Sequence, residues 1–202
     1  MLNRALLVVD VQNDFCPGGA LAVPEGDKIV PILNQHINLF SKNKFPIFAS
    51  RDWHPGVTKH FKQFGGLWPV HCVQGTNGAQ FHPALQLPNS ARILSKGMDS
   101  KKDSYSAFQA LDENDQTFSD VLKDLHIQEL FVGGLATDYC VKSSVLDALK
   151  FGFRTYLLTD AIKGVNLKKH DSKSAIQEMV AAGAHTVTVD QIKSFWQKGD
   201  AK

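Results

Sequence analysis

The stretch LFVGGLATDYCVKSSVLDALKF, residues 130–151, decides the fold. It begins with the apolar run Leu130–Val132, turns at a pair of glycines and continues as a helical pattern over Asp138–Phe151. In that pattern apolar residues recur at spacings of three and four, which is typical of a helix with one buried face. A short strand that leads through a glycine turn into a helix is the building unit of an α/β protein.

Similar units are spread along the rest of the chain. The other apolar runs do not alternate with polar residues, so both faces of each strand are expected to be buried, as in a parallel sheet. The runs are Ala5–Val9, Phe45–Ser50, Ala91–Leu94, Thr155–Leu158 and Thr186–Val189, and the other helical patterns are Asp27–Lys42, Ser172–Ala182 and Asp190–Gln197. The sequence therefore predicts an α/β doubly wound, three-layer fold with a mainly parallel sheet of about six strands.

Length and composition exclude several classes of protein. The chain has 202 residues, with 22 Lys and Arg against 20 Asp and Glu, and its length predicts a single domain, residues 1–202. A formal net charge of +2 leaves no basic excess for a nucleic acid. No apolar stretch approaches the roughly 18 residues that span a bilayer. The odd number of three cysteines rules out a disulfide framework and favours a reducing compartment, the cytoplasm.

Charged residues follow several of the apolar runs where each strand is expected to end. Ligands of open parallel sheets bind at the carboxyl ends of the strands, so these positions are candidates for a site. Any one of them alone is better explained as a turn residue, because Asp is common in turns. Together they place carboxylates, a lysine and a glycine turn on one edge, which favours a site. They are Asp10, Arg51 and Asp52, Lys96, Gly133 and Gly134, and Asp160.

Cys140 lies in the first turn of the helix after the glycines, following Thr137 and Asp138, which can cap that helix. The free N–H groups and the positive dipole at a helix start stabilise a thiolate, and they can also bind the oxyanion of a tetrahedral intermediate. A buried structural cysteine is the alternative, but this setting favours a nucleophile. Cys16 and Cys72 lack the setting and are expected to be structural or to lie near the substrate.

A cysteine nucleophile usually needs a base. No histidine lies at a strand end, whereas Asp10 ends a strand that should neighbour the strand before Cys140. Lys96 can balance the charge of Asp10. We therefore expect a catalytic triad of Asp10, Lys96 and Cys140, with Asp10 as the base.

Four histidines lie in an irregular segment, residues 53–90, which is too long to be an ordinary connection. Asp52 and His54 are two positions apart, so in an extended strand they point to the same side and can chelate one ion, with His71 as a third ligand. Two nitrogens and one carboxylate suit Zn²⁺, Fe²⁺ or Mn²⁺ in a catalytic site. His60 and His82 are expected to be surface or loop histidines.

Five blocks of the chain match the motifs of a known group of enzymes, in order and at suitable spacing. They are LLVVDVQNDFCPGGAL, ASRDWHP, LWPVHCVQGTNGAQFHP, SKGMDSKKDSYSAF and VGGLATDYCV. Along nearly its whole length the chain resembles the cysteine hydrolases of isochorismatase-like fold, and within them the nicotinamidases, also called pyrazinamidases.

The resemblance implies roles for particular residues. It gives the same triad and the same three metal ligands that the strand ends and histidines suggest. It further implies an oxyanion hole made by the backbone N–H groups of Ala136 and Cys140, with a cis peptide bond between Leu135 and Ala136. The segment GVTKHFKQF, which follows DWHP, departs from the family pattern and leaves open whether a fourth protein ligand exists. The ring of the substrate would lie among Phe15, Leu21, Trp68 and Tyr105.

The activity implied by the resemblance is hydrolysis of nicotinamide to nicotinate and ammonia, and of pyrazinamide to pyrazinoate, through a thioester on Cys140. A divalent metal, zinc first, would bind the pyridine nitrogen, and the reaction would serve NAD salvage. The alternatives are another cysteine amidohydrolase acting on a carbamoyl or ureido substrate, an isochorismatase acting on a vinyl ether, and a binding module without activity. The metal ligands and the complete triad argue against these. A small molecule is the expected partner, and a homo-oligomer is left open.

Overall fold

A computed structural model describes residues 3–199 of the chain. Its sheet has six strands in the order β3-β2-β1-β4-β5-β6, and every pair of neighbours is parallel. The strands are β1 (Arg4–Val9), β2 (Ile47–Asp52), β3 (Arg92–Lys96), β4 (Glu129–Leu135), β5 (Arg154–Lys163) and β6 (His185–Val187). This confirms the predicted doubly wound α/β fold with six parallel strands.

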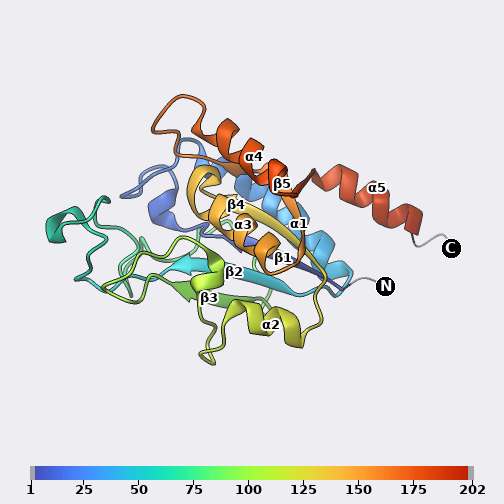
Figure 1. The fold of residues 1–202 in the computed structure, drawn as a ribbon, viewed down its shortest axis with the longest axis horizontal. Coiled ribbons are helices and arrows are strands. Elements are labelled where there is room, and N and C mark those ends of the chain that lie inside the picture. The colour runs from blue at the N-terminus through green and yellow to red at the C-terminus, as the bar shows by residue number, and fades with distance from the viewer. Residues whose placement is uncertain (1–2, 200–202) are drawn as a thin grey trace.

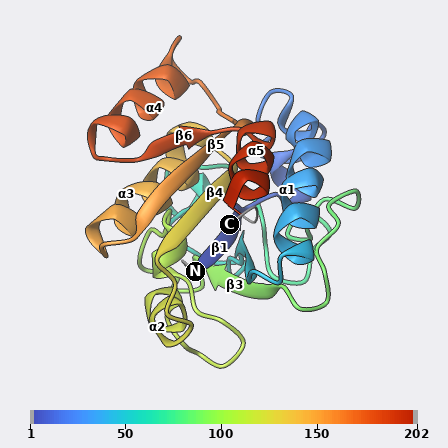
Figure 2. The same cartoon turned by 90° about the vertical axis from the view of Figure 1, so that its right-hand side faces the viewer.

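Helices cover both faces of the sheet, as Figure 2 shows, with α1 and α5 on one side and α2, α3 and α4 on the other. The helices are α1 (Val30–Lys42), α2 (Phe118–Asp124), α3 (Lys142–Lys150), α4 (Asp171–Ala181) and α5 (Val189–Gly199). A π-helix, η5 (Thr137–Val141), precedes α3, and short 3₁₀ helices are η1 (Asn13–Phe15), η2 (Gly26–Ile29), η3 (Lys62–Phe64) and η4 (Ala107–Gln109). None of the helices in residues 3–199 is both long and apolar enough to cross a bilayer.

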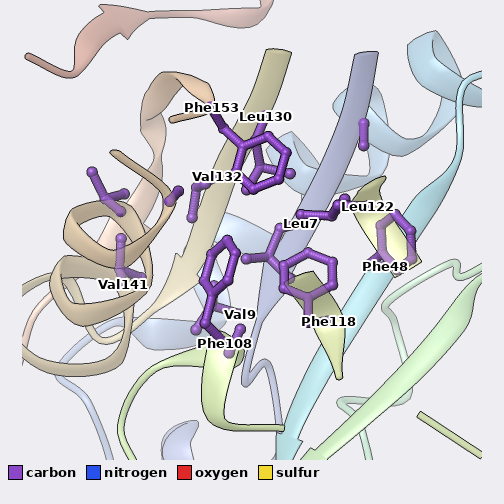
Figure 3. Packing of buried hydrophobic residues seen from close by; sticks show 14 of the residues in the cluster. Leu7, Val9, Phe48, Phe108, Phe118, Leu122, Leu130, Val132, Val141 and Phe153 are labelled. Atoms are coloured by element: carbon purple, nitrogen blue, oxygen red, sulfur yellow. The ribbon is translucent and has the colours of Figure 1, made fainter. Parts of the chain in front are cut away.

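Alternate residues of β1 pack into two separate hydrophobic cores, one on each face of the sheet. Leu7 and Val9 pack with residues of α2, α3 and α4, while Leu6 and Val8 pack with α1 and α5. Figure 3 shows the first of these cores, in which Phe118 lies beside Phe48 and Phe108, at 5.0 Å between ring centroids in each case. Because β1 is buried on both faces, its sequence is a continuous apolar run.

The element boundaries differ from the predicted ones in ways that follow from packing. The strand β5 continues to Lys163, well past its apolar run, and β4 begins at Glu129 and ends at Leu135. The sequence shows only a short helix-like portion at the end of the polar segment 96–120, where α2 begins, because a seven-residue helix carries too few apolar positions to show a clear period. The irregular segment after β2 contains only one short 3₁₀ helix, η3, and in Figure 1 the part that carries η3 lies at the opposite end of the molecule from α5.

Candidate active site

The three residues of the predicted triad come from three different strands and meet at the carboxyl edge of the sheet. Asp10 directly follows β1, Lys96 ends β3, and Cys140 lies in η5, which follows β4. The Nζ atom of Lys96 lies 2.9 Å from Oδ2 of Asp10 and 3.6 Å from Sγ of Cys140. The structure therefore brings these side chains together as the sequence predicts.

A glycine allows the strands to approach closely at this point. Gly134 pairs with Val9 in the register of β1 and β4 and has a φ of +128°. A Cβ atom at Gly134 would collide with the backbone of Val9, the residue before Asp10. Only glycine both adopts this φ readily and leaves that space empty, so Gly134 lets β4 carry η5 up to Asp10.

Burial governs the charges of the triad. It raises the pKa of Asp10 above its ordinary value of 3.8, even though Lys96 acts in the opposite direction, and Ser50 donates a hydrogen bond of 2.7 Å to Oδ1 of Asp10. Burial also raises the pKa of the Cys140 thiol well above its ordinary value, and again Lys96 only partly offsets this. The raised pKa favours the thiol form of Cys140, so a base is needed to ionise it.

The helix start itself also differs from the prediction. Ala136 is the N-cap of η5, and no side chain caps it. Asp138 instead accepts hydrogen bonds from the backbone N–H groups of Val165 (2.9 Å) and Asn166 (2.7 Å), and so fixes the loop after β5 against the turn that carries Cys140. The peptide bond between Leu135 and Ala136 is cis, as the resemblance implies.

Asp52, His54 and His71 form a compact cluster of ligand atoms, which we call the metal cluster. One ligand atom from each residue lies within 4.8 Å of the others, and all three residues are buried. Oδ2 of Asp52 lies 3.5 Å from Nε2 of His54 and 3.8 Å from Nε2 of His71. A carboxylate and two imidazole nitrogens that converge in this way can hold a divalent transition metal.

Backbone carbonyls orient both histidines of the metal cluster. Nδ1 of His54 lies 3.0 Å from the carbonyl oxygen of Gly97, and Nδ1 of His71 lies 2.8 Å from that of Pro69. A carbonyl can only accept, so each Nδ1 carries the proton and each Nε2 keeps a free lone pair. Gly97 has a φ of +69°, and a Cβ there would collide with the ring of His54.

The buried side chain of Gln12 and the half-buried side chain of Asp14, near the end of β1, fix the backbone around the metal cluster. The amide of Gln12 accepts from the N–H of Asp52 (2.8 Å) and donates to the carbonyl oxygens of Asp52 (2.8 Å) and Ala79 (2.9 Å). Oδ2 of Asp14 accepts from the N–H of Cys72 (2.7 Å), the residue after His71. The sequence analysis did not identify either role, since these bonds depend on how distant loops meet.

Lys96 connects the metal cluster to the triad, because its ammonium group pairs with Asp52 as well as with Asp10. Burial alone would raise the pKa of Asp52, but the positive charge of Lys96 and the two neighbouring histidines hold that pKa well below 3.8. Burial alone would lower the pKa of Lys96, but the two carboxylates hold it well above 10.5. Lys96 is therefore a cation between two buried carboxyl groups.

A cavity opens onto both groups of residues. Its walls include Cys140 and the whole metal cluster, and the remainder of the wall is mostly aromatic or aliphatic. All four residues expected around the substrate ring line it, namely Phe15, Leu21, Trp68 and Tyr105. Nε1 of Trp68 donates a 2.9 Å hydrogen bond to the hydroxyl of Tyr105, which joins two of these walls. A planar ring fits such walls, with polar chemistry at one end.

His60 also lines the cavity, although the sequence analysis placed it among surface or loop histidines. It lies in a loop but is buried, and its ring centroid is 4.7 Å from that of His54. Its Nε2 lies 2.8 Å from the carbonyl oxygen of Lys102 and its Nδ1 lies 2.7 Å from Oδ1 of Asp103. Both nitrogens are thus occupied, so His60 adds no free ligand to the metal cluster in this arrangement.

Asp160 does not belong to the site, although it was grouped with the other strand-end residues. It lies within β5, 3.1 Å from Nε2 of the buried His36 of α1, and its other oxygen accepts from the N–H of Val189. Asp160 therefore joins β5 to α1 and to the start of α5. His82 is half-exposed and does not line the cavity.

Comparison with known proteins decides the family. The isochorismatase domain family matches residues 4–191 of the chain. The protein belongs to the isochorismatase family. As a member of this family whose curated relatives hydrolyse an amide, it is an amide hydrolase.

The similarity to individual isochorismatase-family proteins extends over whole chains. A nicotinamidase of Escherichia coli is 46% identical, covering 94% of this chain and 96% of its own. A nicotinamidase of Acinetobacter baylyi is 40% identical, covering 92% of each chain. The crystal structure of a pyrazinamidase of Pyrococcus horikoshii in complex with zinc is 44% identical, covers 92% of this chain and 99% of its own, and superposes with a TM-score of 0.85.

Proposed function

We propose that the protein is a metal-dependent nicotinamidase, which hydrolyses nicotinamide to nicotinate and ammonia and pyrazinamide to pyrazinoate, and which serves NAD salvage. The observation that carries the proposal is that one aromatic-walled cavity opens onto both Cys140 and the metal cluster. The names of the relatives at 46% and 40% identity, and of the zinc-bound pyrazinamidase structure, support the same substrate class.

The triad would carry the covalent chemistry. Asp10 takes the thiol proton of Cys140, and the sulfur attacks the carboxamide carbon. A raised pKa makes the Asp10 carboxylate a stronger base than a solvent-exposed one, which matches the need to deprotonate a buried thiol. Lys96 stabilises the negative charge of Asp10 before Asp10 takes the proton and after it has passed the proton on.

The oxyanion that forms on the carboxamide would accept hydrogen bonds from the backbone N–H groups of Ala136 and Cys140. Asp10 then returns the proton to the nitrogen as ammonia leaves, so that a thioester on Cys140 remains. Asp10 next accepts a proton from an attacking water and passes it to the sulfur as the C–S bond of the thioester breaks, which restores the thiol and releases nicotinic acid, which ionises to nicotinate. The number of protons on Asp10 and Cys140 is the same before and after the cycle.

The metal cluster fits a divalent ion, because its two Nε2 atoms and one carboxylate converge and are oriented by carbonyls behind them. When bound, the ion supplies a Lewis acid for the pyridine nitrogen, which fixes the ring. Zinc is the expected metal, with iron and manganese compatible with the same donor set. The zinc in the Pyrococcus horikoshii structure supports this choice.

The test is ammonia release from nicotinamide by the purified protein, beside Cys140→Ser and beside protein treated with a chelator and then resupplied with Zn²⁺. We expect turnover by the wild type, none by Cys140→Ser, and a loss on chelation that zinc restores. An N-carbamoyl amino acid is run in parallel. Absence of nicotinamide and pyrazinamide turnover with metal present would refute the proposal, and turnover of the carbamoyl compound instead would select the other amidohydrolase. Activity undiminished by complete metal removal would refute the role of the metal alone.

A further inference from the structure

Ser104 lines the cavity and has a buried hydroxyl without a hydrogen-bond partner. Among the side chains described in residues 3–196, four buried N or O atoms have no hydrogen-bond partner, namely Oδ2 of Asp10, Nδ1 of His36 and the Oγ atoms of Ser104 and Ser172. Asp10 still has its ion pair with Lys96. Of these four residues, Ser104 is the one that lines the cavity.

The residues on either side of Ser104 are held by contacts of their own. The preceding Asp103 pairs with His60, and the following Tyr105 accepts from Trp68 through its hydroxyl. The backbone N–H of Tyr105 also donates to Oε1 of Gln109, at 2.9 Å. Ser104 is therefore held between two anchored side chains, with its own hydroxyl left unpaired.

An unpaired buried hydroxyl lowers the stability of a folded protein, because the group has lost its hydrogen bonds to water. Such an atom in a cavity wall is explained when a ligand supplies the missing bond. No group of the described residues supplies this bond in the free protein.

We propose that Ser104 is a substrate-binding residue whose hydroxyl hydrogen-bonds a polar atom of the bound aromatic amide. The proposal rests on the proposed function, because the amide is the substrate named there. A serine hydroxyl can donate or accept, so it suits either a second ring nitrogen or the carboxamide group. This adds a side-chain hydroxyl to the polar groups that the cavity offers the substrate, beside the metal cluster and the backbone N–H groups of Ala136 and Cys140.

Ser104→Ala tests the proposal, with Ser172→Ala as the matched control. Each variant removes one partnerless buried hydroxyl, and Ser172 is not among the residues that line the cavity. We expect both variants to melt at the wild-type temperature or slightly above it, because no hydrogen bond in the free protein is lost. We expect Ser104→Ala to raise the KM for nicotinamide by about 5- to 30-fold with a smaller change in kcat, and Ser172→Ala to change neither.

The outcomes separate a substrate contact from a structural role. A KM of Ser104→Ala within about twofold of wild type for both nicotinamide and pyrazinamide, or a melting temperature more than about 3 °C lower, would overturn the proposal. Pyrazinamide is measured in parallel: an equal loss for both amides assigns the contact to the carboxamide, and a larger loss for pyrazinamide assigns it to the second ring nitrogen. Failure of the wild type to hydrolyse either amide would overturn the proposed function itself, and this appears before any variant is compared.

Discussion

Replacement of Lys96 by methionine removes a charge from the centre of the site while keeping a side chain of similar length. In the wild type the Lys96 side chain is fully buried, with Nζ 2.9 Å from Asp10, and it also pairs with Asp52. Asp10 is 0% exposed and Asp52 is 5% exposed. In Lys96→Met, two buried carboxyl groups remain without their shared cation.

The distance between Nζ of Lys96 and Oδ2 of Asp10 sets the size of the expected loss of stability. Two unit charges 2.9 Å apart interact by about 6 kcal/mol at an effective dielectric constant near 20. Part of this is offset in the wild type by the cost of burying the charges, and breaking a buried pair on one side typically costs about 3–5 kcal/mol. We therefore expect Lys96→Met to lower the free energy of unfolding by about 3–5 kcal/mol near pH 7.5 in metal-free protein.

The loss should depend on pH with a definite sign. The pKa of Asp10 in the folded protein is already above the unfolded value, because the carboxyl group is buried, and loss of Lys96 raises it further. A group with a raised folded pKa contributes stability that is present below its unfolded pKa and is lost as the pH rises through its folded pKa. The difference between Lys96→Met and wild type should therefore shrink as the pH falls toward 4.

Urea unfolding followed by circular dichroism measures the effect, with protein kept metal-free by a chelator so that no ion holds Asp52. The double variant Lys96→Met with Asp10→Asn should recover part of the lost stability, because it removes one of the two unpaired charges. This variant also keeps the test usable if the single variant does not fold. A wild-type urea midpoint for Lys96→Met, or no recovery in the double variant, would refute the reasoning.

Three further predictions follow from single contacts. Cys140→Ala should abolish ammonia release while the urea midpoint stays close to wild type, since its thiol leaves no buried charge behind; residual turnover above about one part in 1,000 would argue against a nucleophilic role. Gly97→Ala should weaken zinc binding by about 10- to 100-fold in a chelator competition, because its Cβ would displace His54, whereas Gly152→Ala, which has a φ of +88° but open space around it, should leave zinc affinity unchanged. Gln12→Ala should lower the free energy of unfolding by about 2–4 kcal/mol in the same urea assay, because it leaves three buried backbone groups unpaired, and a change below about 0.5 kcal/mol would contradict this.

The fold could be predicted because the burial of its strands is visible in one dimension. The runs Ala5–Val9 and Leu130–Val132 are continuously apolar, since helices cover both faces of β1 and β4. The ends of a strand are predicted wrongly where polar residues lie within the strand. Asp160 looked like the end of β5, but it continues the strand because His36 and the N–H of Val189 satisfy its carboxylate. Those partners come from distant segments that the sequence around Asp160 does not reveal.

The site residues also fall into two groups, those that the sequence predicts and those that it does not. Asp10, Lys96 and Cys140 were found because each stands at or soon after the end of a strand, and parallel strands bring such ends together. Ser104 and His60 lie in long irregular segments, where position depends on which loops meet. Only the contacts themselves reveal these two residues: the 2.7 Å contact of Asp103 with Nδ1 of His60, and the missing partner of the Ser104 hydroxyl.

The charges of the site link the catalytic triad to the metal cluster. One lysine faces two buried carboxyl groups, so the metal-free site has an excess of negative charge whenever both are ionised. That excess contributes to the raised pKa of the Cys140 thiol, which both Asp10 and Asp52 push upward after the larger effect of burial. A divalent cation held by Asp52 would reverse the sign of the excess and so favour the ionised thiol and the oxyanion alike. Lys96 pairs with both carboxylates. A charge added at the metal cluster is therefore felt electrostatically at the Cys140 thiol.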